Sequence, residues 1–273
     1  MIQLFKMAWR DIGRNRRRSF LSALGLGLGL GLLMMMASVI NGEMRYTLEA
    51  AVRLQNGHLQ VRSATYTEEN TSLAWDNLLE DPAGLSAQIA AIPGVRVATP
   101  RLFASGLIAE GKETAAVGIY GIDPSSPAND PYREGLVSGQ FLSADDREGI
   151  LNGQNLADKL GLGAGDSLYM TVNTSAGDLA EQAFTVRGVY STRIPAFDGS
   201  TVFLPLAKTQ ALVQAGDRAS AIFVLLAEAD QLDAVMAALP TPAEGRYQVK
   251  TFAEANPIFT QTEEMARAYM GIL

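Results

Sequence analysis

An uninterrupted apolar stretch near the N-terminus constrains this chain more than any other feature. Residues 20–40 read FLSALGLGLGLGLLMMMASVI and contain no charged side chain. At about 1.5 Å per residue, a helix of this length spans the roughly 30 Å apolar thickness of a bilayer. We therefore predict a transmembrane helix over residues 20–40. The alternative is a cleaved signal peptide, but its apolar region has about 7–15 residues, and no clean cleavage site follows Met36.

The charges on either side of this stretch indicate its orientation. Residues 1–19 hold six basic side chains against one acidic one, and four of the basic ones lie directly before the stretch, at Arg14, Arg16, Arg17 and Arg18. The four charges just after the stretch, on Glu43, Arg45, Glu49 and Arg53, balance. Because cytoplasmic flanks carry the excess of Lys and Arg, we predict a cytoplasmic segment over 1–19 and a main domain outside the cytoplasm. A basic end can also be a nucleic-acid arm, but the apolar stretch favours membrane lipid as its partner and no nucleic acid.

Two further patterns concern contacts in the membrane. Trp9 lies among apolar residues at helical spacing in 2–13, which predicts an amphipathic helix on the inner leaflet with Trp9 at the headgroup level. A plain extension of the membrane helix is the alternative. Glycines four residues apart, a spacing that lets two helices approach closely in lipid, are candidates for helix packing: Gly25, Gly27, Gly29 and Gly31. The alternative is that the alternating Gly and Leu are low-complexity filler.

The pattern of residues 41–260 predicts an α+β domain with two lobes. A β-α-β pattern covers 58–98 and a second one covers 221–251, with further strand patterns between them. The expected strands of the middle part are 101–109, 115–120, 149–151, 167–173, 183–190 and 202–204. Two β-α-β units around a β-rich middle predict a domain with an inserted lobe.

The chain becomes helical again after about residue 253. We expect residues 261–273 to begin a second transmembrane helix, which the apolar ending MARAYMGIL favours. An amphipathic helix that packs on the domain is the alternative.

A run of glycines follows the short helix expected at 155–160. Gly161, Gly163 and Gly165 superficially suggest a dinucleotide-binding loop, but they come after a helix and before a strand, the reverse of the order that phosphate binding requires. We interpret the run, together with Asp166, as a tight helix-to-strand turn that needs positive φ angles. We therefore expect these residues to be structural.

Several kinds of chemistry lack the residues that they need. The chain has no cysteine and one histidine, His58, which excludes thiolate and multi-histidine metal sites. No GxxxxGK[ST] loop is present, so the chain by itself does not split ATP in the P-loop manner. The adjacent acidic pairs point in different directions on a strand or helix, unlike the facing pair of an acid–base site. We expect no catalytic residue, no cofactor and no metal.

Several blocks of the sequence occur in the same order in a known family. They are GHLQV at 57–61, PGVRVATPRL at 93–102, YGID at 120–123, ILNGQNLADKLGLGAGDSLYM at 150–170 and VRGVYSTRIPAFDGSTVFLPL at 186–206. With the basic and apolar start, they make the chain similar to the permease subunits of ABC transporters of the MacB/FtsX-like type. The resemblance is greatest to the lipoprotein-releasing LolC/LolE branch and covers nearly the whole chain.

The resemblance implies a subunit with four membrane helices in a bacterial inner membrane, with its large domain in the periplasm. It also implies that the two β-α-β units form the membrane-proximal lobe and that residues of about 124–200 form the inserted lobe. It implies a cytoplasmic ATPase subunit and a second permease subunit as partners, and a lipoprotein cargo or a periplasmic carrier. Such a transporter closes its ATPase on ATP, and the membrane helices then move the periplasmic domains. The hairpin between Asn173 and Ala183 is shorter than a LolC-type subunit would carry, which favours a LolE-like, lipoprotein-type or efflux exporter.

Two classes of function therefore compete. The first is a permease subunit that couples ATP hydrolysis by its partner to a periplasmic conformational change, with lipoprotein release as the expected activity. The second is a membrane-anchored periplasmic binding or scaffold protein without a transport role.

Overall fold

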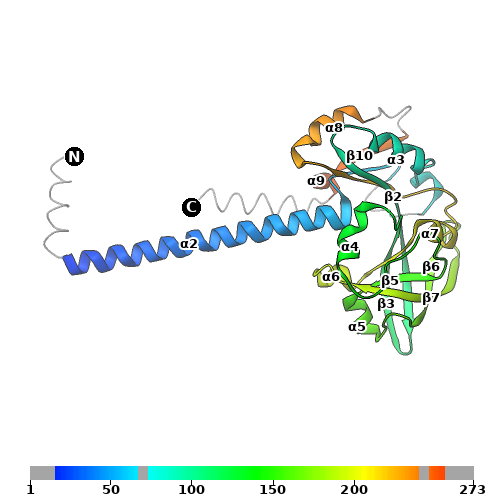
Figure 1. Cartoon of the computed structure of the whole chain (residues 1–273), viewed down its shortest axis with the longest axis horizontal. Coiled ribbons are helices and arrows are strands. Elements are labelled where there is room, and N and C mark those ends of the chain that lie inside the picture. Colours follow the sequence, from blue (N-terminus) through cyan, green and yellow to red (C-terminus); the bar gives the residue numbers. More distant parts are fainter. Residues whose placement is uncertain (1–15, 67–72, 240–245, 256–273) are drawn as a thin grey trace. The chain divides into compact units, whose positions relative to one another are not determined.

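The computed structural model describes residues 16–66, 73–239 and 246–255 (Figure 1). The chain divides into two compact units, of which one contains the N-terminal helix and the other comprises Ala51–Thr262. The predicted amphipathic segment at 2–13 and the predicted second membrane helix at 261–273 lie outside the described residues.

The N-terminal helix α2 is longer than the predicted membrane helix at both ends. It runs from Arg16 to Ala51, over 36 residues, without a proline to interrupt it. Its part from Arg16 to Ile40 is long and apolar enough to cross a membrane, and the large apolar side chains of this part are exposed. A soluble protein rarely leaves so many Leu and Met side chains of one helix in solvent. Their exposure supports a bilayer as the surroundings of this part of α2.

The first sheet contains the two predicted β-α-β units, which interlock. Its strand order is β10 (Tyr247–Thr251), β1 (Leu59–Ser63), β9 (Ala221–Leu226) and β2 (Val95–Glu110), and all three pairs are antiparallel. Helix α3 (Pro82–Ala90) connects β1 to β2, and α8 (Leu232–Ala238) connects β9 to β10. Strand β9 thus lies between β1 and β2, and β1 lies between β9 and β10. This is the ferredoxin-like arrangement. The α+β prediction is confirmed.

The inserted lobe is a closed barrel of six strands. From residue 102 onward, β2 pairs with β3 (Glu113–Ile122), β3 with β8 (Thr201–Pro205), and β8 with β5 (Gly149–Gly153). The ring continues from β5 to β7 (Leu179–Tyr190) and β6 (Ser167–Asn173), and β6 pairs with β2 again. A short strand, β4 (Leu136–Gly139), pairs with the end of β7. The expected range of about 124–200 therefore covers part of this lobe, because β2, β3 and β8 also belong to its barrel.

Each lobe has its own apolar core. Inward-facing residues of the barrel strands, such as Ile108, Leu168, Met170 and Phe184, fill the barrel and are almost fully buried. In the first sheet, α3 and α8 cover one face. The opposite face carries Phe223 and Leu225, which pack with Val52 and Ala128. This second face therefore packs against Val52, which belongs to the same compact unit as the sheet.

The remaining elements are short. The 3₁₀-helices are η2 (Trp75–Asn77), η3 (Pro127–Asn129) and η4 (Ala229–Gln231), and the segment η1 (Val52–Asn56) is a π-helix. The short α-helices are α4 (Asp130–Glu134), α5 (Gln154–Leu160), α6 (Pro195–Asp198), α7 (Leu206–Leu212) and α9 (Phe252–Ala255).

Candidate coupling site at the base of the N-terminal helix

The N-terminal helical segment ends in a π-turn that is part of the domain. Directly after α2, the π-helix η1 occupies Val52–Asn56, and the Gly57 N–H closes it by donating to the Val52 carbonyl at 2.8 Å. Gly57 has a φ of 72°, and a Cβ there would lie 2.6 Å from the Val224 carbonyl oxygen, so the turn needs glycine. π-turns are rare and are frequent at functional sites.

A fully buried arginine binds the last carbonyls of this turn. Arg101 has no solvent exposure, and its Nη1 donates to the carbonyl oxygens of Leu54 at 3.2 Å and Gln55 at 3.3 Å. The Tyr132 hydroxyl also donates to the Leu54 carbonyl. The Arg101 guanidinium lies over the Phe223 ring, 3.6 Å from its centroid. We call these five residues, Leu54, Gln55, Arg101, Tyr132 and Phe223, the junction cluster.

The position of Arg101 in β2 links the junction cluster to both lobes. Arg101 pairs with Ala221 in the first sheet, and the next residue, Leu102, pairs with Gly121 in the barrel. Arg101 therefore lies where β2 leaves one lobe and enters the other, as Figure 1 shows for the strand as a whole. One side chain thus connects the end of the N-terminal helical segment to the strand that the two lobes share.

Tyr132 connects the same turn to the barrel wall. Its ring lies 4.4 Å from that of Phe203 on β8 and 5.7 Å from that of Tyr190 on β7, measured between centroids. The ring of Phe197 on α6 stacks on that of Tyr132, with centroids 6.2 Å apart. The Tyr190 hydroxyl donates to the Thr201 carbonyl at 3.0 Å, which satisfies the polar end of that ring. Rings packed in this way hold α4 firmly against the barrel.

Burial determines the electrostatics of the junction cluster. It raises the pKa of Tyr132 well above its ordinary value, although the nearby Arg101 acts in the opposite direction. It lowers the pKa of Arg101, which stays protonated at neutral pH because guanidinium is so basic. Tyr132 is therefore a neutral donor, and the dipoles of the helix-end carbonyls stabilise the buried cation.

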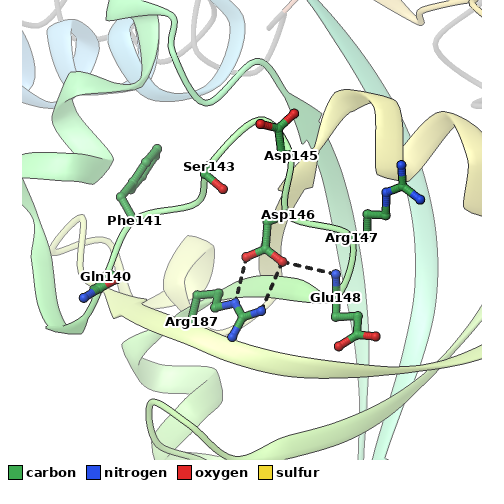
Figure 2. A pocket seen from close by; sticks show the side chains of 8 residues that line it. All are labelled: Gln140, Phe141, Ser143, Asp145, Asp146, Arg147, Glu148 and Arg187. Carbon is green, nitrogen blue, oxygen red and sulfur yellow. Dashed lines mark hydrogen bonds and ion pairs between the residues drawn. The ribbon is translucent and has the colours of Figure 1, made fainter.

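A polar pocket of about 580 Å³ lies elsewhere on the inserted lobe, beside β7 and the loop before β5 (Figure 2). In its wall, Arg187 Nε donates to Asp146 Oδ2 at 2.7 Å, and the N–H groups of Glu148 and Gly149 donate to Asp146 Oδ1. The Arg187 hydrogen bond holds the pKa of Asp146 below its ordinary value. A second bond, from Arg187 Nη2 to Asp146 Oδ1 at 3.3 Å, brings the donors around this carboxylate to four. Asp146 is therefore held in an ion pair that stabilises the loop.

The glycine run forms the helix-to-strand turn after α5. Gly161 has a φ of 67° and caps α5 in the left-handed region, Gly165 has a φ of 98°, and Gly163 is not among the glycines with positive φ. The Asp166 carboxylate accepts from the Gly163 N–H at 2.7 Å, and the Gly165 N–H donates to the Val186 carbonyl at 2.8 Å. These contacts tie the turn to β7. The structural role of the four residues stays a prediction.

The residues predicted to contact the membrane are separate from the junction cluster. Gly25, Gly27, Gly29 and Gly31 lie on α2, and a Cβ at each would meet no atom within 4 Å. A helix partner at these glycines stays a prediction. Arg16, Arg17 and Arg18 form the exposed first turn of α2. Trp9 and Arg14 lie outside the described residues.

Sequence reasoning missed the junction cluster. Arg101 lies inside the block PGVRVATPRL, which served as a family marker without any role for its arginine. A signal was present, because Arg101 lies between Pro100 and the apolar Leu102. A charged side chain is unusual in such apolar surroundings. Nothing in the sequence indicated its partners, which lie 47 and 46 residues earlier in the chain. No cluster of three or more potential metal ligands is present among the described residues.

Comparison with known families identifies the domain. Residues 19–241 match the family model of the MacB-like periplasmic core domain. The chain belongs to this family. Its members are parts of ABC transporter permeases, which work with cytoplasmic ATPase partners. The match does not single out the LolC/LolE branch, so the resemblance to that branch rests on the sequence blocks alone.

Two solved structures are similar to the chain. One is the periplasmic region of MacB from Actinobacillus actinomycetemcomitans, with 14% identity, a TM-score of 0.49, and coverage of 78% of this chain and 95% of that one. The other is the extracellular domain of the noncanonic ABC-type transporter YknZ from Gram-positive bacteria, with 14% identity, a TM-score of 0.49, and coverage of 71% and 99%. A search of curated proteins finds no match.

Proposed function

We propose that this chain is a permease subunit of an ABC transporter in which α2 crosses the inner membrane and moves the periplasmic domain through the junction cluster. The observation that carries the proposal is the buried Arg101, which holds the end of the helical segment at the residue where β2 passes between the lobes. Pulling η1 away would leave a buried guanidinium and two carbonyls without partners, which is costly. A movement of η1 therefore moves both lobes.

The energy for this movement comes from a partner. Family membership and the absence of a P-loop support a cytoplasmic ATPase subunit as that partner, with a second permease subunit completing the transporter. The basic cluster before residue 20 supports a cytoplasmic N-terminus and a periplasmic main domain.

The proposed activity is the release of lipoproteins from the inner membrane, with a periplasmic carrier as acceptor. It is supported by the sequence blocks shared with the lipoprotein-releasing branch, notably the one at 150–170. The short β6–β7 hairpin, whose turn spans residues 174–178, makes a LolE-like role more consistent with the chain than a LolC-like one.

Replacing Arg101 tests this proposal. In the transporter reconstituted with its ATPase, Arg101→Met keeps a side chain that can pack on Phe223 but removes the hydrogen bonds to Leu54 and Gln55. We expect the release of lipoprotein per ATP hydrolysed to fall by about tenfold or more, since charged hydrogen bonds contribute about 1.5–3 kcal/mol. ATP hydrolysis itself should continue.

Two further variants make the result decisive. Tyr132→Phe removes a single hydroxyl and keeps the ring packing, so it should fold and show a smaller loss of the same kind. Arg187→Met breaks an exposed ion pair in the same lobe and should leave release unchanged. Wild-type release per ATP in both Arg101→Met and Tyr132→Phe would contradict a coupling role for the junction cluster.

A further inference from the structure

The π-turn η1 contains one residue more than an α-helical turn in the same place would. Its closing hydrogen bond runs from the Gly57 N–H to the Val52 carbonyl, five residues earlier, whereas an α-turn would pair this N–H with the Arg53 carbonyl. Such a turn is in effect an α-helix with one inserted residue. The same residues can therefore form an α-turn if the helix before them shifts by one residue.

The C-terminal end of this turn is fixed to the first sheet. Gln60 on β1 is 1% exposed, and its Nε2 donates to Asn56 Oδ1 at 3.1 Å. The His58 N–H donates to the Val224 carbonyl of β9 at 2.9 Å. Because these bonds hold the last residue of the turn and the chain after it, a conversion of the turn is taken up at its other end, which continues α2.

The residues around η1 leave hydrogen-bonding capacity unused. Arg101 bonds to the turn through Nη1, while its Nε and Nη2 are buried without a partner. Thr99 Oγ1, two residues earlier on the same face of β2, is also buried and unpaired. So is Asn129 Oδ1, beside the Ala128 that packs with Val52. These are four of the seven such side-chain atoms in the part of the chain that the structure describes. Native proteins contain few of them, so their concentration around one turn requires an explanation.

We propose that η1 is a two-state turn that converts between the π form of this structure and an α form when α2 moves. In the α form, the carbonyls of Leu54 and Gln55 turn about the helix axis. The unpaired Nε and Nη2 of Arg101 then provide donors for these carbonyls in their new positions. The buried guanidinium thus has carbonyl partners in both forms, and the conversion does not leave it without any.

The conversion has a defined size. Each α-helical residue turns by about 100° and rises by about 1.5 Å, so loss of the extra residue rotates α2 by about 100° and moves it by about 1.5 Å relative to the fixed end of the turn. Helix shifts of about 1–2 Å between two packed arrangements are a common form of conformational switching. A movement of α2 would therefore reach the junction cluster as a change between two discrete positions. This inference rests on the proposed function, which supplies the force on α2.

Distances between two spin labels test the switch, because the chain has no cysteine of its own. One label is attached at Gly42→Cys on α2, where a Cβ meets no atom within 4 Å, and the other at Val137→Cys on β4, which is 55% exposed. Labelled chains are diluted with unlabelled ones in the transporter reconstituted with its ATPase. We expect two distance populations whose ratio changes between the nucleotide-free and the ATP-bound state. A rotation of about 100° carries a label that lies about 8 Å from the helix axis over roughly 12 Å, which such measurements resolve.

Deletion of Arg53 should leave a single distance population. Arg53 is the exposed residue of η1, and without it the turn has the number of residues that an α-turn needs. Deletion of Glu49, an exposed residue of α2, is the matched control. It also shifts the helix by one residue but keeps the π-turn, so both populations should remain.

The outcomes separate this inference from the proposed function. A single population in the wild-type chain in both nucleotide states would overturn the two-state turn, and this measurement decides even where a shortened chain does not fold. Two populations that survive deletion of Arg53 would also overturn it, because the movement would then arise elsewhere in the chain. Release of lipoprotein per ATP by the wild-type protein reports on the proposed function separately. Intact release with a single distance population would remove the switch and leave the permease role in place.

Discussion

Arg101 shows how a protein places a charge in its interior without a carboxylate. Its acceptors are the carbonyls of Leu54 and Gln55, at the C-terminal end of the helical segment, where the helix dipole is negative. The planar guanidinium also stacks on Phe223, which an ammonium would do less well. A lysine would keep the charge but lose this geometry, so the site is specific for arginine.

His58, which directly follows the π-turn and contacts β9, makes the stability of the domain depend on pH. Burial, assisted by the charge of Arg53, lowers the pKa of His58 below its ordinary value of 6.5, and its Nδ1 accepts a hydrogen bond from the Leu226 N–H at 3.2 Å. Between the lowered pKa and 6.5, the unfolded chain binds the proton and the folded chain does not. The free energy of unfolding is therefore complete above about pH 6.5 and should decrease as the pH falls below it.

Urea unfolding of the purified chain between pH 7.5 and 5.5 measures this effect. His58→Asn keeps a side-chain acceptor and has no proton to gain, so its stability should change less over this interval. Equal pH dependence of His58→Asn and the wild-type chain would show that other groups cause the decrease.

Gly165 is the glycine of the turn after α5 that we expect to be least replaceable. Its φ of 98° lies outside the left-handed helical region that other residues tolerate, whereas Gly161, with a φ of 67°, lies inside it. No atom lies within 4 Å of a Cβ at either position, so the cost comes from the backbone alone. Gly165→Val should destabilise the protein by about 1–3 kcal/mol and lower the melting temperature by several degrees.

The neighbouring glycine provides the control for this prediction. Gly163 has no positive φ, and a Cβ there would lie 3.7 Å from the Asp166 carboxylate, which is an ordinary contact. Gly163→Ala should therefore change the melting temperature little. If calorimetry gave Gly165→Val and Gly163→Ala the same small effect, positive φ would not be what the turn requires.

At the scale of elements, β2 shows what the sequence predicts well and what it leaves open. Alternation predicts strands at 95–98 and 101–109, and the structure joins them in one strand through Pro100. Proline lacks an N–H, so it reads as a break, although here it marks the place where the strand changes sheets. Local pattern thus locates the strand residues, while the change of partner depends on contacts with β9 and β3 that are distant in the chain.

Sequence reasoning missed several short elements, among them those that carry Tyr132 and Leu54 of the junction cluster. Helix α4 and strand β4 lie in or after a turn-rich stretch whose Pro and Asp residues indicate loop. The π-turn at 52–56 follows helical periodicity, which does not distinguish a π-turn from an α-turn over five residues. The glycine turn was recognisable because its signal is local. The junction cluster was not, because Arg101, Tyr132 and Leu54 meet only in the folded chain.

At the scale of the whole molecule, the chain divides its charge and its apolar surface between two tasks. The basic residues at the start of the chain and the apolar side chains of α2 suit a membrane, while the acidic remainder forms a domain with two cores. This division orients the chain. Since Lys and Arg accumulate on the cytoplasmic side, the positive end should remain inside the cell and the two lobes outside it.

Labelling of single cysteines tests this orientation directly. Val137→Cys should react with a membrane-impermeant maleimide in cells whose inner membrane is intact, because Val137 is 55% exposed on the proposed periplasmic side. Gln3→Cys should react after the inner membrane is permeabilised, since residue 3 precedes the arginines at 14–18. The cysteine-free chain reports background. Labelling of Gln3→Cys in intact cells, with protection of Val137→Cys, would reverse the orientation, and with it the assignment of the domain to the periplasm.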